Sequence, residues 1–207
     1  MILIGISGKK GVGKDLLASF LKQKYGFVNI PFAHELKAAV RRDFGFTLDH
    51  TDGALKEQPT SFFREIISQE STDPRSEYWT PKEIMIAYGQ FFRQFDRNYW
   101  VKKTFDRIQQ IRMFQNYGAD QRVSISDVRF RNEADHIKSQ GGILVRLERK
   151  PELNIYKEES MDISETELDD YQGFDFVCPK QSNIVPKDLE LFSDFLMNNI
   201  LALKESN

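Results

Sequence analysis

The feature that most constrains this chain is a glycine-rich stretch, GISGKKGVGKD, which directly follows the apolar run from Met1 to Ile4. Gly8, Gly13 and Lys14 match the G-x-x-x-x-G-K frame of a phosphate-binding loop. In such loops, backbone N–H groups between a buried strand and a helix surround a polyphosphate. Asp15 stands where a serine or threonine hydroxyl normally holds magnesium. The sequence predicts a nucleotide phosphate site with an unusual metal arrangement; a glycine-rich turn without ligand is the alternative.

Length, charge and cysteine content narrow the class of protein. The 207 residues suffice for one well-buried core, so we expect a single domain over residues 1–207. A net charge of −2 indicates neither a nucleic-acid partner nor an anionic membrane surface. Cys178 is the only cysteine, which excludes an internal disulfide and favours a reducing cytoplasm. No secretory signal or membrane-spanning stretch is expected from the apolar pattern.

Strands and helices are predicted to alternate along most of the chain. Short apolar runs predict strands at 2–6, 27–31, 123–126, 143–147 and 174–178. Apolar residues at helical spacing predict helices that begin near residues 16, 34, 61, 81, 99, 131 and 186. Loop composition marks 45–59 and 71–78, and the charged stretch 150–172 is expected to be a mobile excursion. This order predicts a three-layer α/β/α P-loop fold with a mostly parallel central sheet and ligands at the carboxyl ends of its strands.

Charged residues follow the predicted strand at 123–126. Asp127 is placed like the aspartate that orients magnesium in P-loop enzymes, with a helix-capping role as the alternative. Arg129 and Arg131 come next and suit anionic phosphates, although they could equally form surface ion pairs with Glu133 or Asp135. Asp15 could hold the metal or simply complement the positive end of its helix.

Five segments together resemble, in order, the deoxynucleoside monophosphate kinases of tailed bacteriophages. The resemblance spans residues 2 to about 178, and its segments are GKKGVGKD, FAHELK, YGQFFRQFDRNYW, SDVRFRNEADHIKSQGGILVRLER and SETE. It implies an adenylate-kinase-like core with a helical acceptor-binding region at about 45–118 and a lid at about 150–172. The implied reaction moves the γ-phosphoryl group of ATP to a deoxynucleoside monophosphate with Mg²⁺, in the cytoplasm of a phage host.

The resemblance also implies roles for individual residues. ATP would be held by Gly8, Lys10, Gly11, Val12, Gly13, Lys14 and Asp15. Magnesium would be held by Asp15 and Asp127. Catalysis would rest on Lys14, Asp15, Arg129, Arg131 and Arg149. The acceptor would contact Lys37, Gln90, Arg93, Trp100 and Glu165. Plainer alternatives are a solvated Lys37, a core position for Trp100, and a capping box that contains Glu165.

Two other functions stay open at this stage. A phosphomevalonate-kinase-like enzyme shares a basic loop with GKD, although the aromatic stretch YGQFFRQFDRNYW favours a nucleobase acceptor. The second alternative is a nucleotide-binding module that does not transfer phosphate. The arginine density from Arg129 to Arg149 argues against this alternative, because a simple binder has less need of cations beyond the glycine loop. We expect small-molecule nucleotides as partners, no nucleic acid and no membrane; a homodimer stays open because the aromatic helices could leave an apolar patch exposed.

Overall fold

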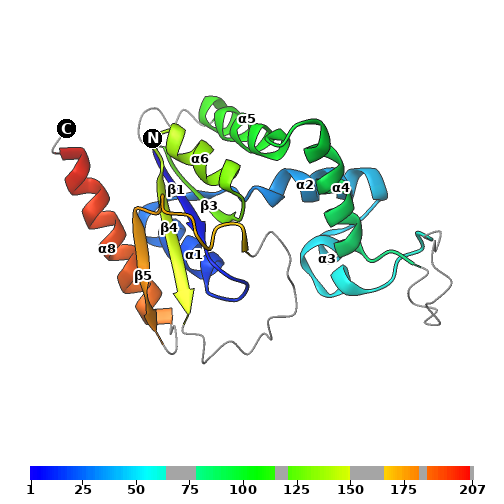
Figure 1. Ribbon diagram of the computed structural model, residues 1–207, viewed down its shortest axis with the longest axis horizontal. Coiled ribbons are helices and arrows are strands. Elements are labelled where there is room, and N and C mark those ends of the chain that lie inside the picture. Colours follow the sequence, from blue (N-terminus) through cyan, green and yellow to red (C-terminus); the bar gives the residue numbers. More distant parts are fainter. Residues whose placement is uncertain (64–77, 115–120, 150–165, 182–185, 206–207) are drawn as a thin grey trace. The chain divides into compact units, whose positions relative to one another are not determined.

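The computed structural model describes residues 1–63, 78–114, 121–149, 166–181 and 186–205 (Figure 1). The chain forms two compact units, one of Met1–Phe32 with Thr104–Asn207 and the other of Ala33–Lys103. The helical region predicted at about 45–118 overlaps the second unit. The interpretation as a single domain and the lid function of 150–172 stay predictions, and residues 150–165 lie outside the described part.

The first unit is built on a parallel five-stranded sheet. Its elements are β1 (Ile2–Ser7), α1 (Lys14–Tyr25), β2 (Val28–Asn29), the later part of α5 (Tyr99–Phe114), β3 (Arg122–Val128), α6 (Arg131–Ser139), β4 (Ile143–Arg149), β5 (Phe176–Gln181) and α8 (Pro186–Glu205). The strand order is β2-β3-β1-β4-β5, and every pairing is parallel. The predicted α/β fold is therefore confirmed. The chain leaves β1 towards one side of the sheet and later returns to its other side, so β1 marks the switch point where such sheets bind ligands.

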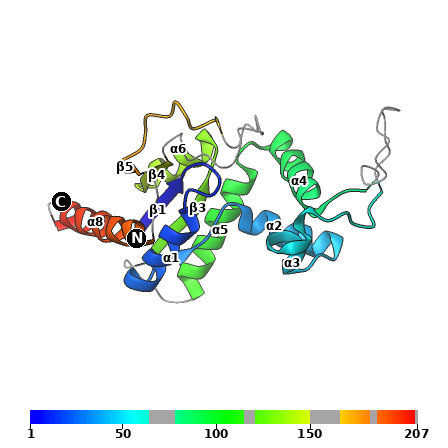
Figure 2. The same cartoon turned by 90° about the horizontal axis from the view of Figure 1, so that it is seen from below.

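Helices lie on both faces of this sheet (Figure 2), and alternate residues of β1 point to opposite faces. Ile4 and Ile6 are fully buried in a cluster that includes residues of α1 and α8. Gly5 points the other way, where a Cβ atom would lie 2.7 Å from Ile137 Cδ1 of α6. Helices therefore cover both faces, as the alternation of strands and helices predicted.

The second unit is helical and contains α2 (Ala33–Phe44), α3 (Leu48–Asp52), the 3₁₀ helix η1 (Ala54–Glu57), α4 (Pro81–Phe95) and the start of α5. The predicted capping box of α4 is confirmed, because Thr80 Oγ accepts from the Glu83 N–H at 3.3 Å and Glu83 Oε2 accepts from the Thr80 N–H at 2.8 Å. The loop predicted at 45–59 is wrong, since α3 and η1 occupy it. The helix predicted from 61 does not begin there: Phe63 forms an antiparallel bridge with Tyr78, and 64–77 lie outside the described part.

Candidate phosphate-binding and acceptor sites

The glycine loop between β1 and α1 is wrapped around the ammonium group of Lys14. Lys14 Nζ donates to the carbonyl oxygens of Gly8 at 2.6 Å and Lys9 at 3.0 Å. Gly8 has a φ of +145°, and a Cβ atom there would lie 2.5 Å from the Leu147 carbonyl oxygen, so only glycine fits. Gly13 is the N-cap of α1 and makes no side-chain capping hydrogen bond. The loop and the first turn of a 12-residue helix thus form the kind of terminus that binds phosphate.

The other predicted ATP residues lie on the same loop. Lys10 and Gly11 are exposed, whereas Val12 is buried and its N–H donates to the Lys9 carbonyl oxygen at 3.3 Å. Val12 therefore anchors the loop to the core and offers a ligand its backbone only.

Asp15 is tied to β3 by a chain of polar side chains that crosses two strands. Its Oδ1 accepts from the buried hydroxyl of Ser126 at 3.0 Å. Ser126 Oγ in turn accepts from Asn29 Nδ2 at 3.0 Å, and Asn29 Oδ1 accepts from Ser124 Oγ at 3.2 Å. The rotamer of Asp15 is therefore set by β2 and β3 and not by its own helix alone. Sequence reasoning missed Ser126 and Asn29, although polar residues in a buried strand are the signal that marks them.

Asp127 lies inside β3 and does not close it, because the strand continues to Val128. Its Oδ1 accepts from the Phe32 N–H at 2.7 Å, which fixes the chain after β2. Within the described ranges no group of three or more His, Cys, Asp or Glu side chains could enclose a metal ion. The Mg²⁺ role of Asp15 and Asp127 stays a prediction; carboxylates are ligands that this ion takes, together with water and substrate phosphate oxygens.

The two arginines after Asp127 have different surroundings. Arg129 lines a small depression beside Gly8 and Lys9 of the glycine loop. Arg131 forms an ion pair with Asp170, and its guanidinium group lies 5.9 Å from the centre of the Tyr171 ring. The observed ion-pair partner of Arg131 is therefore Asp170, whereas the sequence suggested Glu133 or Asp135. Glu133 instead caps α6 by accepting from the N–H groups of Arg129 at 2.8 Å and Phe130 at 3.1 Å.

Asp169 joins the glycine loop to β4, a connection that the sequence did not reveal. It accepts from Lys9 Nζ at 2.6 Å and from Arg146 Nη2 at 2.9 Å. Burial raises the pKa of Asp169, but hydrogen bonds from these two cations outweigh burial and hold it below its usual range. Neighbouring Leu168 is buried. The end of the predicted excursion, residues 166–172, therefore packs against the core of this unit.

In the second unit, Lys37 belongs to a charged cluster between α2 and α3. Lys37 forms an ion pair with Asp52, and Arg41 Nη1 lies 3.5 Å from the other oxygen of the same carboxylate. Arg41 also donates to the buried Thr51 hydroxyl at 2.8 Å. Burial opposes ionisation of Asp52, yet Lys37, Thr51 and Arg41 together keep its pKa lowered. Lys37 is thus one of two cations held on a single anionic group.

The remaining acceptor candidates are placed less uniformly. Gln90 is exposed and Arg93 half-buried on α4. Trp100 is only 4% exposed, and its indole N–H donates to the Gly89 carbonyl oxygen at 3.1 Å, which favours the core role over contact with a base. Glu165 and the side chain of Arg149 lie outside the described part of the chain.

One viral relative supports the kinase interpretation. The chain is 30% identical over 191 residues to an Acanthamoeba polyphaga mimivirus protein named "Putative deoxynucleotide monophosphate kinase", with 89% of this chain and 91% of the viral one aligned. Among solved structures, dephospho-CoA kinase from Campylobacter jejuni gives a TM-score of 0.49 at 10% identity, covering 96% of each chain. No family profile matches the chain. In the ranges described, no helix is long and apolar enough to cross a membrane.

A phosphate-binding loop at the switch point of a parallel sheet, together with this relative, defines a P-loop nucleotide kinase. The relative is aligned over nearly its whole length. The chain belongs to its family, the deoxynucleotide monophosphate kinases.

Proposed function

We propose that the protein transfers the γ-phosphoryl group of ATP to the 5′-phosphate of a deoxynucleoside monophosphate, giving ADP and the deoxynucleoside diphosphate. The observation that carries this proposal is the glycine loop at the switch point, with Asp15 held by Ser126 of the neighbouring strand. The choice of a deoxynucleotide acceptor is supported by the name of the mimiviral relative.

The donor site suits this reaction because phosphoryl transfer needs positioning and charge neutralisation more than covalent chemistry. Lys14 would exchange the carbonyl oxygens of Gly8 and Lys9 for the β- and γ-phosphate oxygens of ATP. An oxygen of the acceptor phosphate attacks the γ-phosphorus, and the bond to the β,γ-bridging oxygen breaks as ADP leaves. Mg²⁺ bound by Asp15 and Asp127 would neutralise charge on the phosphates. The transferring phosphoryl group would be stabilised by Lys14 and by three arginines at the carboxyl edge of the sheet, Arg129, Arg131 and Arg149.

For the acceptor, we propose that the α-phosphate binds Lys37 together with Arg41. Both cations contact the Asp52 carboxylate, and this pairing supports an anion-binding role for this part of α2. A phosphate dianion offers more oxygens than a carboxylate, so it can compete for the same pair. Gln90, Arg93 and Glu165 are proposed as further acceptor contacts, while the burial of Trp100 makes it a supporting residue.

The test is acceptor-dependent ADP release with ATP and Mg²⁺, in which each deoxynucleoside monophosphate, each ribonucleotide counterpart and phosphomevalonate is offered separately. We expect turnover with one or more deoxynucleotides and a loss of about a hundredfold or more in Lys14→Ala. Lys22→Ala is the matched control, because this exposed lysine lies in the last turn of the same helix. Turnover with phosphomevalonate alone would reassign the enzyme, and ATP binding without any turnover would indicate a binding module.

A further inference from the structure

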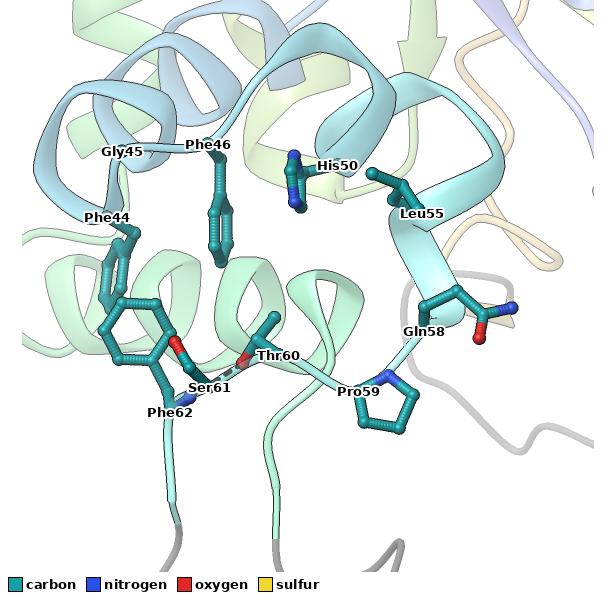
Figure 3. Close-up of a pocket in the computed structure, with 10 residues that line it drawn as sticks. All are labelled: Phe44, Gly45, Phe46, His50, Leu55, Gln58, Pro59, Thr60, Ser61 and Phe62. Carbon is teal, nitrogen blue, oxygen red and sulfur yellow. Dashed lines mark hydrogen bonds between the residues drawn. The ribbon is translucent and has the colours of Figure 1, made fainter.

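A hollow of about 280 Å³ lies in the second unit, at the carboxyl end of α2 (Figure 3). Its apolar lining comes from Phe44, Phe46, Leu55, Pro59 and Phe62, and its polar lining from His50, Gln58, Thr60 and Ser61. None of the described residues that line it carries a carboxylate, ammonium or guanidinium group. The hollow therefore suits an uncharged group, and a phosphate would find no countercharge within it.

The aromatic rings of the wall form flat surfaces that hold one another in place. Phe46 and His50 are stacked, with ring centres 4.9 Å apart and planes 6° apart. Phe62 meets Phe46 edge-on at 5.9 Å and Phe44 edge-on at 5.2 Å. Figure 3 shows Phe46 and His50 projecting from one side of the hollow towards Thr60 and Pro59. Phe44 also stacks with Phe46 at 5.7 Å, so these rings form one fixed wall. A rigid aromatic wall favours a planar, aromatic ligand over a flexible aliphatic one.

Polar atoms at the rim of the hollow can form hydrogen bonds with the edge of such a ligand. His50 Nδ1 lies 3.2 Å from the Thr47 backbone nitrogen and 2.8 Å from the Thr47 hydroxyl oxygen, so Nε2 is the ring nitrogen that can meet a ligand. The Gln58 amide makes no side-chain hydrogen bond with any described residue, so it can both donate and accept. Thr60, by contrast, fixes the floor by donating to the Trp79 carbonyl oxygen at 2.6 Å.

The cationic cluster lies along the same helix as the hollow. Lys37 and Phe44 are seven residues apart in α2, which puts them on one face about 10 Å from each other along the axis. Arg41 precedes Phe44 by three residues and lies on that face as well. An anion site is thus followed by an uncharged aromatic hollow, the order in which a nucleoside monophosphate presents its phosphate and its base.

We propose that this hollow binds the nucleobase of the acceptor nucleotide, with its phosphate on Lys37 and Arg41. The inference rests on the proposed function and names the residues that would select its acceptor. An isoprenoid phosphate has no polar edge for the Gln58 amide to bind, so the hollow favours a nucleotide over that rival.

The experiment compares Phe46→Ala and Gln58→Ala with Leu48→Ala, whose side chain is 69% exposed and outside the hollow. The KM for the best deoxynucleoside monophosphate, the KM for ATP and inhibition by 2-deoxyribose 5-phosphate are measured for each variant. We expect the acceptor KM to rise about tenfold in Phe46→Ala and severalfold in Gln58→Ala. ATP and the base-free sugar phosphate should bind as in the wild type, and Leu48→Ala should change nothing. Lys37→Ala should weaken both the nucleotide and the sugar phosphate.

Unchanged acceptor KM in both hollow variants would overturn the inference, as would an equal loss of the base-free sugar phosphate. Phe46 also packs on the core of this unit, so the exposed Gln58 keeps the test valid if Phe46→Ala fails to fold. A wild type without turnover would defeat the proposed function instead. Calorimetric titration with the nucleotide then tests whether the hollow binds the base. Nucleotide binding that the two variants weaken would support the inference, and an absence of binding to the wild type would overturn it.

Discussion

Replacing Gly8 by alanine should destabilise the protein and its phosphate site more than the same substitution at a glycine that also has a positive φ but has free space around it. The new Cβ atom would lie 2.5 Å from the Leu147 carbonyl oxygen and 2.8 Å from Val12 Cγ1, with φ at +145°. The unfavourable φ costs about 1–3 kcal/mol. Overpacking against the β4 backbone adds about 1–3 kcal/mol, because that oxygen is held by the sheet and cannot turn away. We therefore expect a loss of about 2–6 kcal/mol in the free energy of unfolding.

Gly26→Ala is the matched control. Its φ is +71° and nothing lies within 4 Å of the added Cβ atom, so it should cost only about 1 kcal/mol. Urea unfolding gives the two stabilities, and titration with a fluorescent ATP analogue gives nucleotide affinity. We expect Gly8→Ala to lose ATP binding and Gly26→Ala to keep it. Equal stabilities, with ATP binding retained in Gly8→Ala, would refute the steric reasoning.

Three further substitutions test other contacts. Ser126→Ala removes the hydrogen bond that orients Asp15 and should lower kcat about tenfold, measured by ADP release, while folding is kept. Burial lowers the pKa of His136 below 6.5, so as the pH falls the unfolded chain takes up a proton on this imidazole before the native protein does. The free energy of unfolding, measured with urea, should therefore fall from pH 7 towards pH 5, and it should fall less in His136→Gln. Trp100→Phe removes the indole hydrogen bond to the Gly89 carbonyl oxygen and should cost about 0.5–1.5 kcal/mol by urea unfolding, whereas a base-stacking role would instead raise the acceptor KM at unchanged stability.

The sequence predicted the elements whose signals are local. The strand, glycine loop and helix that open the chain, the end of α1 at Gly26 and the capping box at Thr80 are confirmed, because each depends on residues a few positions apart. The short helices within 45–59 were missed for the opposite reason. α3 has only five residues, and its one large apolar side chain, Leu48, is 69% exposed. The helix therefore has no apolar face that a periodic pattern could reveal.

The contacts that shape the candidate sites join distant parts of the chain. Ser126 reaches Asp15 across 111 residues, and Asp169 reaches Lys9 across 160, which no spacing rule detects. The aromatic hollow was likewise hidden, because its rings come from segments read as a helix end and a loop. The homodimer and the cytoplasmic location stay predictions.

The most direct test of the central claim follows the phosphoryl group itself. The protein is incubated with Mg²⁺, ATP labelled at the γ-phosphate and one deoxynucleoside monophosphate at a time, and the products are separated by chromatography. We predict that the label appears in a deoxynucleoside diphosphate, and that Lys14→Ala abolishes this product while Lys22→Ala does not. Label found only in inorganic phosphate or in unreacted ATP, whichever deoxynucleotide is offered, would contradict the assignment.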